Sequence, residues 1–290
     1  MAERGGLGHI LGINRRNLQL IYRHNPRSGF PVVDDKVKTK EVLSQAGVPV
    51  PRTIRVIDSF LAARRSLEEL ARQPTFVVKP ARGHAGGGVL IVASDPAGGW
   101  RTPSGRRLDA GEMLQHLGDI LFGVYSLGRT DDRALVEERV NPHPFFREIY
   151  ARGIADIRII LFREQPVMSM LRIPTDASDG KANLHQGAMA VRVSLSDGRT
   201  GPGVYRGKPV TRHPDTGAPV SDQVLPFWNE LVAHARTAAR AVPLKYVGVD
   251  LVIDEALGPL ILEVNARPGL QIQVINGAGL VPAVESVQCR

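Results

Sequence analysis

The spacing of apolar residues changes near residue 35. The chain before that point is rich in Arg, Asn, Gly and Pro, so it predicts a mostly irregular segment with one short helix. Beyond it, apolar residues recur at helical spacing in several stretches, and Gly47 supplies a stop for the first of them. The helices predicted in this way span residues 15–22, 36–46, 61–72, 113–121 and 222–241.

Runs of β-branched and apolar residues predict strands between these helices. The predicted strands span residues 75–80, 89–92, 134–138, 154–162, 167–172, 188–193, 246–253 and 260–264. Residues 194–219 hold many Gly and Pro and are predicted as a loop, and the hairpin at 246–264 is predicted to be the last structured unit. Helices and strands do not alternate regularly, so the order predicts an α+β fold rather than a Rossmann sheet.

Composition is that of a globular protein. The 290 residues are 43% hydrophobic and 23% charged, which is enough apolar material for one large domain or several smaller lobes. No stretch approaches the ~20 apolar residues that cross a bilayer, and residues 1–20 lack the apolar core of a secretory signal. The single cysteine, Cys289, excludes an intramolecular disulfide, and a cytoplasmic location fits it most simply.

The charge balance favours anionic partners. With 37 basic and 29 acidic residues the chain carries a net charge of +8, which would attract nucleotides, acidic peptides, nucleic acid or a membrane surface. Aromatic residues make up only 5%, and no basic run is interleaved with aromatics that could stack on bases. Nucleic acid is therefore disfavoured as the partner.

Two carboxylates and an amide gather near the C-terminal end, at Asp250, Glu263 and Asn265, here called the acidic hairpin. Residues two apart on a strand share a face, so Glu263 and Asn265 point the same way. Depending on the turn, Asp250 would lie opposite Leu262 or Glu263. Such hard oxygen ligands suit Mg²⁺ together with substrate phosphates, and the alternative is a solvated face with ordinary acidic residues.

A lysine and a glycine-rich loop form a second candidate site. Lys79 lies near the end of a predicted strand, and the loop from Gly83 to Gly88 follows it before another strand begins. Glycines allow backbone amides to approach phosphate oxygens, and the lysine adds positive charge. Because a strand rather than a helix follows, this is not a Walker A loop, and an ordinary hairpin turn is the alternative.

Taken together, these features resemble a known superfamily. In chain order they are Lys36, Lys79 with its glycine loop, Glu137-Glu138 and the acidic hairpin. Their order and spacing resemble the ATP-grasp superfamily, and within it the RimK-type glutamate ligases and alpha-L-glutamate ligase-like proteins. The resemblance covers roughly residues 34–275, and its most specific stretch is Glu263-Val264-Asn265-Ala266-Arg267-Pro268-Gly269.

The resemblance implies an ATP-grasp fold, in which two α+β subdomains clasp ATP. It divides the chain into a basic N-terminal segment (1–35), a small lid subdomain with its preceding helix (36–138) and a large subdomain with the metal site (139–290). Relatives carry a fuller domain before the first lysine. The N-terminal region is therefore expected to be shortened, and part of the usual acceptor-binding wall is expected to be replaced.

The resemblance also implies roles for individual residues. The residues implied in ATP binding are Lys36, Lys79, Gly86, Gly87, Gly88, Glu137, Glu138, Asp156 and Asn183. Mg²⁺, with Mn²⁺ as an alternative, would be held by Asp250, Glu263 and Asn265. Arg158, Lys181 and Arg267 would supply positive charge to the reacting phosphoryl and carboxylate oxygens. Considered singly, Lys36 also fits a surface helix, and Asp156 with Arg158 fits a cross-strand ion pair.

The implied activity is a ligase that joins a carboxylate to an amine. A substrate carboxylate would attack the γ-phosphate of ATP, and an amine would displace phosphate from the acylphosphate to form an amide. The implied partners are ATP and an amino acid, peptide or protein, with glutamate suggested by the family and a homo-oligomer left open. The alternatives are a ligase or phosphotransferase for another acid, such as a sugar-linked one, and a non-catalytic nucleotide-binding regulatory module.

Overall fold

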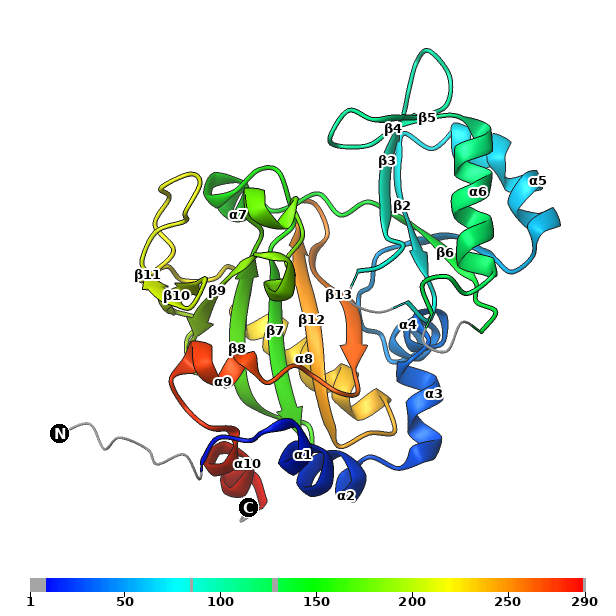
Figure 1. The fold of residues 1–290 in the computed structure, drawn as a ribbon. Helices are drawn as coiled ribbons and strands as arrows, with labels where there is room; N and C mark the ends of the chain where they lie inside the picture. Colours follow the sequence, from blue (N-terminus) through cyan, green and yellow to red (C-terminus); the bar gives the residue numbers. More distant parts are fainter. Residues whose placement is uncertain (1–8, 84–85, 127–129, 289–290) are drawn as a thin grey trace. The chain divides into compact units, whose positions relative to one another are not determined.

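The computed structural model describes residues 9–83, 86–126 and 130–288 (Figure 1). Contacts divide the chain into two compact units. The first unit comprises Met1–Asp34, Lys38–Val50 and Asn141–Arg290, and the second comprises Asp35–Val37 and Pro51–Val140. The predicted boundary grouped residues 38–50 with the lid. The structure instead groups them with the first unit, where Leu43 and Val48 belong to the hydrophobic core.

The second unit is a six-stranded sheet with two helices packed on it (Figure 1). The strands, in sheet order, are β1 (Thr53–Ile57), β6 (Ala134–Glu138), β2 (Thr75–Pro80), β3 (Leu90–Ser94), β4 (Trp100–Arg101) and β5 (Arg107–Leu108). The helices are α5 (Phe60–Ala71) and α6 (Ala110–Leu121). Ser59 caps α5, and Asp109 with Glu112 forms a capping box on α6. The helices bury residues such as Leu70 against Phe76 of the sheet.

The first unit contains a seven-stranded sheet. Its strands, in sheet order, are β11 (Lys208–Val210), β10 (Thr200–Tyr205), β9 (Met189–Val193), β8 (Gln165–Ile173), β7 (Asp156–Phe162), β12 (Tyr246–Asp254) and β13 (Gly258–Asn265). Every pairing in this sheet is antiparallel. The antiparallel sheets and separate helices confirm the predicted α+β class.

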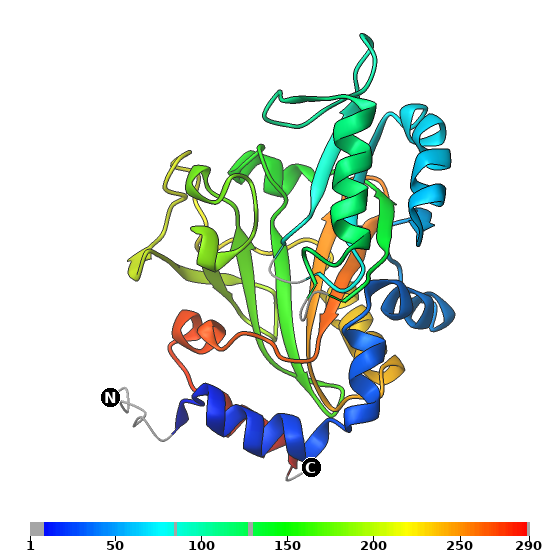
Figure 2. The same ribbon diagram turned by 45° about the vertical axis from the view of Figure 1, so that its right-hand side comes forward.

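The two faces of this sheet are covered differently. One face packs against α8 (Trp228–Ala241), which lies behind the sheet in Figure 1, through residues such as Ile157, Val249 and Leu231. One end of the other face is covered by short helices at both ends of the chain, seen side by side in Figure 2. These helices are α1 (Ile13–Arg16), the π-helical turn Asn17–Ile21, α2 (Tyr22–His24) and α10 (Leu280–Gln288), with α9 (Gln271–Asn276) beside them.

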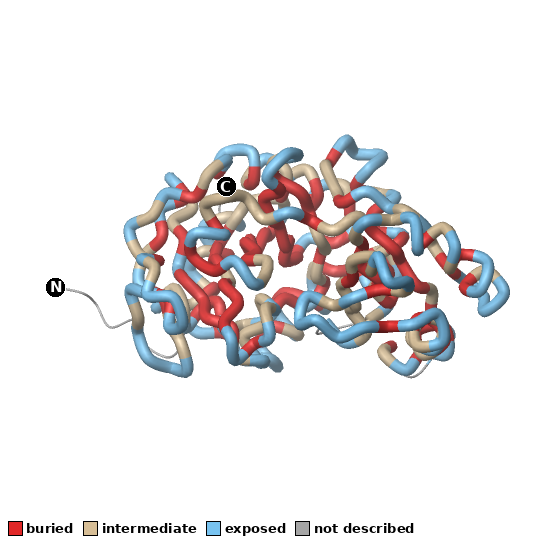
Figure 3. Tube along the Cα trace, turned by 90° about the horizontal axis from the view of Figure 1, so that it is seen from above, coloured by how far each residue is buried: buried red, intermediate tan, exposed pale blue. Residues whose placement is uncertain are grey.

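The buried positions follow from this layering. Figure 3 shows buried stretches running through the interior, with exposed stretches on the outer loops. Strand β7 is buried along its whole length, because it lies inside the sheet between β8 and β12 and one of its faces packs against α8. Successive residues of β7 therefore divide between two environments, apolar toward α8 and charged toward the open end of the other face.

Several predicted elements were wrong. The hairpin is not the last structured unit, because α9 and α10 follow it and bury Ile272, Leu280 and Val284. Helix α8 begins at Trp228 rather than at residue 222, because Phe227 has a left-handed backbone conformation that ends the preceding loop. The predicted loop over 194–219 contains β10 and β11, a strand pair at the sheet edge, where proline is tolerated.

Helix α3 (Phe30–Val33) and helix α7 (Pro144–Ile149) were not predicted, since each is short and contains a proline in its first turn. Helix α4 (Lys36–Gln45) is present as predicted. Within the described ranges, no helix combines the length and apolar character needed to span a bilayer.

Candidate active site

The acidic hairpin is formed by β12 and β13, and a β-bulge sets its register. Near the turn, Ile253 pairs with Pro259, but a shift between Asp250 and Leu251 leaves Leu262 as the extra residue. Asp250 therefore lies opposite Glu263, which is one of the two registers predicted. Without the bulge, Asp250 would face Leu262 and the two carboxylates would be out of step.

The predicted metal ligands lie together in the structure. The Nδ2 atom of Asn265 donates to Oδ2 of Asp250 at 3.2 Å and to Oε1 of Glu263 at 3.1 Å. Asp250 is buried, whereas Glu263 and Asn265 are partly exposed. The amide thus cross-links the two carboxylates at the accessible edge of the sheet.

Arg158 and Arg172 hold the buried end of the same site. Arg158 on β7 lies directly opposite Asp250 and donates to it from Nε at 2.6 Å and from Nη2 at 2.5 Å. Arg172 on β8 donates from Nη2 to Asp250 at 2.8 Å. It also forms a two-bond pair with Asp156, at 2.5 and 2.7 Å. The residues of this charged cluster are Asp156, Arg158, Arg172, Asp250, Glu263 and Asn265.

Sequence analysis did not single out Arg172. It was placed at the end of a predicted strand, 167–172, with no role. A charged residue in an otherwise apolar strand was the available signal. The register that would have placed it beside Asp156 could not be derived, because a bulge also interrupts the β7–β8 pairing.

The two buried aspartates differ in their electrostatics. Burial, reinforced by the charge of Asp250, raises the pKa of Asp156 to about 7 although Arg172 opposes this shift. Burial would also raise the pKa of Asp250, but the guanidinium groups of Arg158 and Arg172 outweigh it and hold that pKa below its ordinary value. Asp250 therefore stays ionised, and Asp156 takes the first proton as the pH falls.

The chemistry of this cluster fits a magnesium ion. When ionised, Asp156, Asp250 and Glu263 carry one more charge than Arg158 and Arg172 neutralise. Across the described part of the chain, no group of three or more His, Cys, Asp or Glu side chains is arranged to hold a metal. The available donors are thus two carboxylates and the Asn265 amide, which can present its oxygen after rotation. A donor set of this kind suits Mg²⁺ when substrate oxygens complete the coordination.

The predicted nucleotide-binding residues of the second unit make their own contacts. Lys79 Nζ lies 2.5 Å from Oε2 of the buried Glu137. Lys36 Nζ donates to the carbonyl oxygen of Gly83 at 2.6 Å. Glu138 forms an exposed ion pair with Arg52. Both lysines therefore lie on structured parts of this unit.

Of the glycine loop, residues 84 and 85 fall outside the described ranges, and Gly86–Gly88 form a turn. Gly86 and Gly88 have positive φ angles of 75° and 71°. A Cβ atom on Gly88 would lie 2.5 Å from the Tyr125 ring, so glycine is required there on both grounds.

The remaining predicted site residues lie in the first unit. Lys181 is exposed and, among the described residues, makes none of the hydrogen bonds or ion pairs that hold the charged cluster. Asn183 caps a short 3₁₀ turn by accepting a hydrogen bond from the His185 amide at 3.0 Å. Arg267 stacks over Phe30, with 4.3 Å from Cζ to the ring centroid, and lies 3.4 Å from Asp34.

Comparison with known proteins identifies the family. A model of the family described as sugar-transfer associated ATP-grasp matches residues 15–289. The chain belongs to this family. A probable alpha-L-glutamate ligase of Pasteurella multocida is 26% identical over 248 residues, which cover 86% of this chain and 58% of that protein. The chain thus spans somewhat over half the length of this curated relative.

Solved structures show the same fold. A biotin carboxylase of Campylobacter jejuni, in a β,γ-ATP complex, superimposes with a TM-score of 0.54 at 14% identity, covering 89% of this chain and 46% of the other. D-cycloserine synthetase superimposes with a TM-score of 0.51 at 16% identity, covering 90% and 71%. The predicted ATP-grasp membership and fold are confirmed, and the curated relative is named as a ligase.

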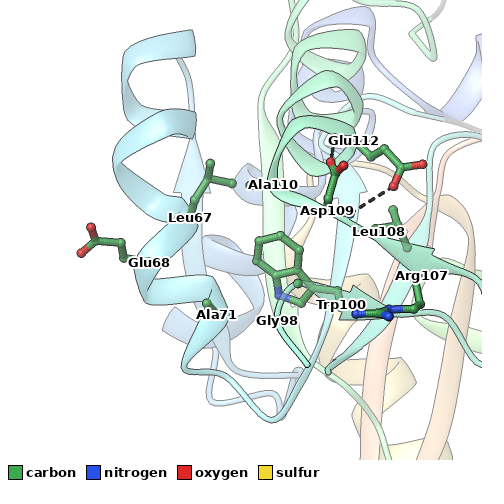
Figure 4. Close-up of a pocket in the computed structure, with 11 residues that line it drawn as sticks. Leu67, Glu68, Ala71, Gly98, Trp100, Arg107, Leu108, Asp109, Ala110 and Glu112 are labelled. Carbon is green, nitrogen blue, oxygen red and sulfur yellow. Dashed lines mark hydrogen bonds between the residues drawn. The ribbon is translucent and has the colours of Figure 1, made fainter. Parts of the chain in front are cut away.

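This ATP-grasp chain also has a surface pocket in its second unit, of about 480 Å³ (Figure 4). It lies between α5 and the start of α6, beside the indole of Trp100. Its lining includes Asp109 and Glu112, whose carboxylates are used in the capping box. None of the predicted site residues lines this pocket.

Proposed function

We propose that this chain is an ATP-dependent ligase that joins a carboxylate to an amine through an acylphosphate, releasing ADP and phosphate. The observation that carries the proposal is the charged cluster, in which two carboxylates and an amide lie beside two arginines on one face of a sheet. Membership of the ATP-grasp family and the ligase name of the curated relative support it.

Asp250, Glu263 and Asn265 would hold Mg²⁺, and the bound ion would supply neutralisation of phosphate charge. The geometry favours a positioning role for Arg158, because its Nε and Nη2 atoms are both engaged by Asp250. Arg172 would likewise have a positioning role, because it donates to both Asp156 and Asp250. The two arginines fix the carboxylates at the buried end, so the accessible end presents its oxygens in one orientation.

The proposed reaction has two steps. A substrate carboxylate oxygen attacks the γ-phosphorus as the bond to the β-phosphate oxygen breaks, which yields an acylphosphate and ADP. The amine nitrogen then attacks the acyl carbon, phosphate leaves, and the amine loses a proton as the amide forms. The half-exposed guanidinium of Arg267 would attract an anionic substrate. Lys181 is proposed as a further cation from the resemblance alone.

The nucleotide assignments are proposals within the second unit. Lys79 would contact the ATP phosphates while Glu137 holds its ammonium group in place. Lys36 would also contact the ATP phosphates, and its ammonium group would be held in place by the carbonyl oxygen of Gly83. Gly86, Gly87 and Gly88 would let backbone amides approach phosphate oxygens, since no side chain intervenes.

A second candidate differs only in substrate. The matching family is described as sugar-transfer associated, which suggests an acid carried on a sugar as an alternative to a free amino acid. The charged cluster would activate such a carboxylate in the same way. Glutamate, suggested by the name of the curated relative, is therefore one member of the panel to be tested rather than the assumed donor.

The test is product analysis with Mg-ATP and a panel of amino acids and sugar acids, each alone and with amine acceptors. ADP and phosphate that form only with a particular acid would support the ligase. AMP and pyrophosphate would mean adenylation and would contradict the acylphosphate route. Glu263→Gln, which removes one proposed metal ligand at a partly exposed position, is expected to abolish the acid-dependent ADP. Unchanged turnover in this variant would assign the activity to another site.

A further inference from the structure

The N-terminal segment, residues 9–34, is tied to the loop that follows the acidic hairpin, residues 266–270, here called the motif loop. The Arg16 Nη1 atom donates to the carbonyl oxygen of Pro268 at 2.8 Å. The amide of Leu11 donates to the side chain of Gln273 at 2.9 Å, just beyond this loop. The ring of Phe30 supports the Arg267 guanidinium. The segment is therefore a fixed part of the surroundings of the motif loop.

Arg16 is a buried cation of the N-terminal segment. Its side chain is buried, with 8% exposure, and its hydrogen bonds within the described ranges go to neutral oxygens, those of Pro268 and of the Asn17 amide. Among the described residues Arg16 forms no ion pair. Its guanidinium has more N–H donors than these contacts use. A buried, unpaired cation is costly unless an anion reaches it.

The hydroxyl of Tyr246 is a second unsatisfied group nearby. Tyr246 is fully buried, and its hydroxyl has no hydrogen-bond partner among the residues that the structure describes. Burial raises the pKa of the Tyr246 hydroxyl, and the positive charges of Arg16 and Arg158 partly oppose this shift. The ring of Tyr246 packs in one hydrophobic cluster with Leu20 and Ile21 of the N-terminal segment. Within the described part of the chain, its buried hydroxyl is a donor without an acceptor.

The sheet and the motif loop bring these groups together. Tyr246, Gly248 and Asp250 alternate along β12, so they share one face of the sheet. Gly248 has no side chain, and Pro268 packs over it, because a Cβ there would lie 2.7 Å from the proline. Arg16 therefore contacts the motif loop at Pro268, the residue that follows Arg267. Burial lowers the pKa of Arg16, and the positive charge of Arg267 lowers it further.

We propose that Arg16 and the hydroxyl of Tyr246, with Arg267, form a binding site for a carboxylate group of the acid substrate. The inference rests on the proposed ligase function. It assigns the acid to a site built partly by the N-terminal segment. A planar guanidinium matches a carboxylate in geometry, and a hydroxyl donor supplies a further bond. The carboxylate would neutralise Arg16 and satisfy Tyr246 in one step.

The test measures binding of free acids to the full chain without ATP. Thermal shift and calorimetry would use glutamate, glutarate and inorganic phosphate as probes. Tyr246→Phe removes only the unpartnered hydroxyl, so the free variant is expected to be as stable as the native protein or more so. The same variant should bind at least about tenfold more weakly whichever of the two carboxylates, glutamate or glutarate, binds the native protein. Loss of binding without loss of stability is a result that a purely structural tyrosine would not give.

Arg16→Gln provides the second arm, with Arg15→Gln as the matched control. Arg15 precedes Arg16 on the same helix, is exposed, and donates to Gln19 at 3.0 Å. Arg16→Gln should weaken carboxylate binding at least about tenfold, whereas Arg15→Gln should leave it unchanged. If both variants weaken binding equally, the effect comes from the overall positive charge of the segment and not from Arg16, and the proposal is overturned.

Other outcomes separate the inference from the ligase itself. Carboxylate binding that is unaffected by Tyr246→Phe and Arg16→Gln, in a chain that turns over ATP, would overturn the site and leave the ligase standing. Binding of inorganic phosphate but not of carboxylates would also overturn the proposal, since the site would then bind phosphoryl groups. Carboxylate binding that depends on Arg16, in a chain without acid-dependent ADP formation, would support the site and count against the ligase.

Discussion

Arg158 donates to Asp250 through two nitrogen atoms, at 2.6 and 2.5 Å, from the position directly opposite it in the sheet. This bidentate pair lies at the buried end of the charged cluster. It explains how a carboxylate proposed as a metal ligand can be buried, because the guanidinium compensates its charge. The same pair makes Asp250 important for stability as well as for the proposed activity.

Asp250→Asn is expected to destabilise the first unit by about 3 kcal/mol, because it leaves the buried Arg158 without its carboxylate. Arg172 would still be paired with Asp156. Denaturant unfolding measures the loss. Glu263→Gln, in the same cluster but partly exposed, is the control, and its unfolding free energy should change by less than about 1 kcal/mol. Similar losses in both variants would show that the Arg158–Asp250 pair has no special weight.

The raised pKa of Asp156 predicts a pH dependence of stability. Because its folded pKa is about 7 and its ordinary value is 3.8, the folded protein holds a proton that the unfolded chain has released between these values. The contribution to stability is therefore full below about pH 4 and is lost as the pH rises to about 7. Unfolding of native protein and of Asp156→Asn between pH 4 and 8 tests this. The difference in unfolding free energy between the two should change across that window and be flat above it. A difference that is constant from pH 4 to 8 would contradict the shift.

Two glycines in the same region should respond differently to alanine. A Cβ on Gly248 would lie 2.7 Å from Pro268, whereas a Cβ on Gly269 meets nothing within 4 Å. Gly248→Ala should cost about 1–3 kcal/mol in unfolding free energy, because the motif loop must move away from the sheet. Gly269→Ala should be close to neutral. If Gly248→Ala is equally stable, the motif loop does not pack on β12 as described.

Arg267 is expected to matter for activity much more than for stability. It is half-exposed, so removing its stacking on Phe30 and its contact with Asp34 should cost less than about 1 kcal/mol. Arg267→Ala should nevertheless lower kcat/KM by about 100-fold if the guanidinium contacts the anionic substrate. Arg152 is a matched control, since it also stacks on a ring, that of Tyr150, and pairs with Asp176. A comparable loss of activity in Arg152→Ala would mean that the effect is not local.

Much of the fold was predictable because its signals are local. Helix α5 has apolar residues at helical spacing after a capping serine, and the β2–β3 hairpin has β-branched runs around a glycine loop. The elements that were missed depend on tertiary packing. Helix α10 is stabilised by burying Leu280 and Val284 against the sheet, and β11 forms only because β10 offers it an edge.

The candidate site likewise contains features that local sequence predicts and features that depend on tertiary packing. The sequence indicated that Asp250, Glu263 and Asn265 would share a face, because strand alternation fixes this for two of them. It left two registers open for Asp250, since a bulge at Leu262 is a tertiary feature. It could not show that Arg16, more than two hundred residues away, donates to the loop beside Asn265. Contacts of that sequence separation follow from the fold and not from local pattern.

The most direct test of the central claim is transfer of oxygen from the acid to phosphate. The acid that supports ADP formation would be labelled with ¹⁸O in its carboxylate and turned over with Mg-ATP and its amine acceptor. If an acylphosphate forms, the phosphate released carries one labelled oxygen, which ³¹P NMR or mass spectrometry detects. Unlabelled phosphate formed together with the amide would contradict carboxylate attack on the γ-phosphate and, with it, the proposed function.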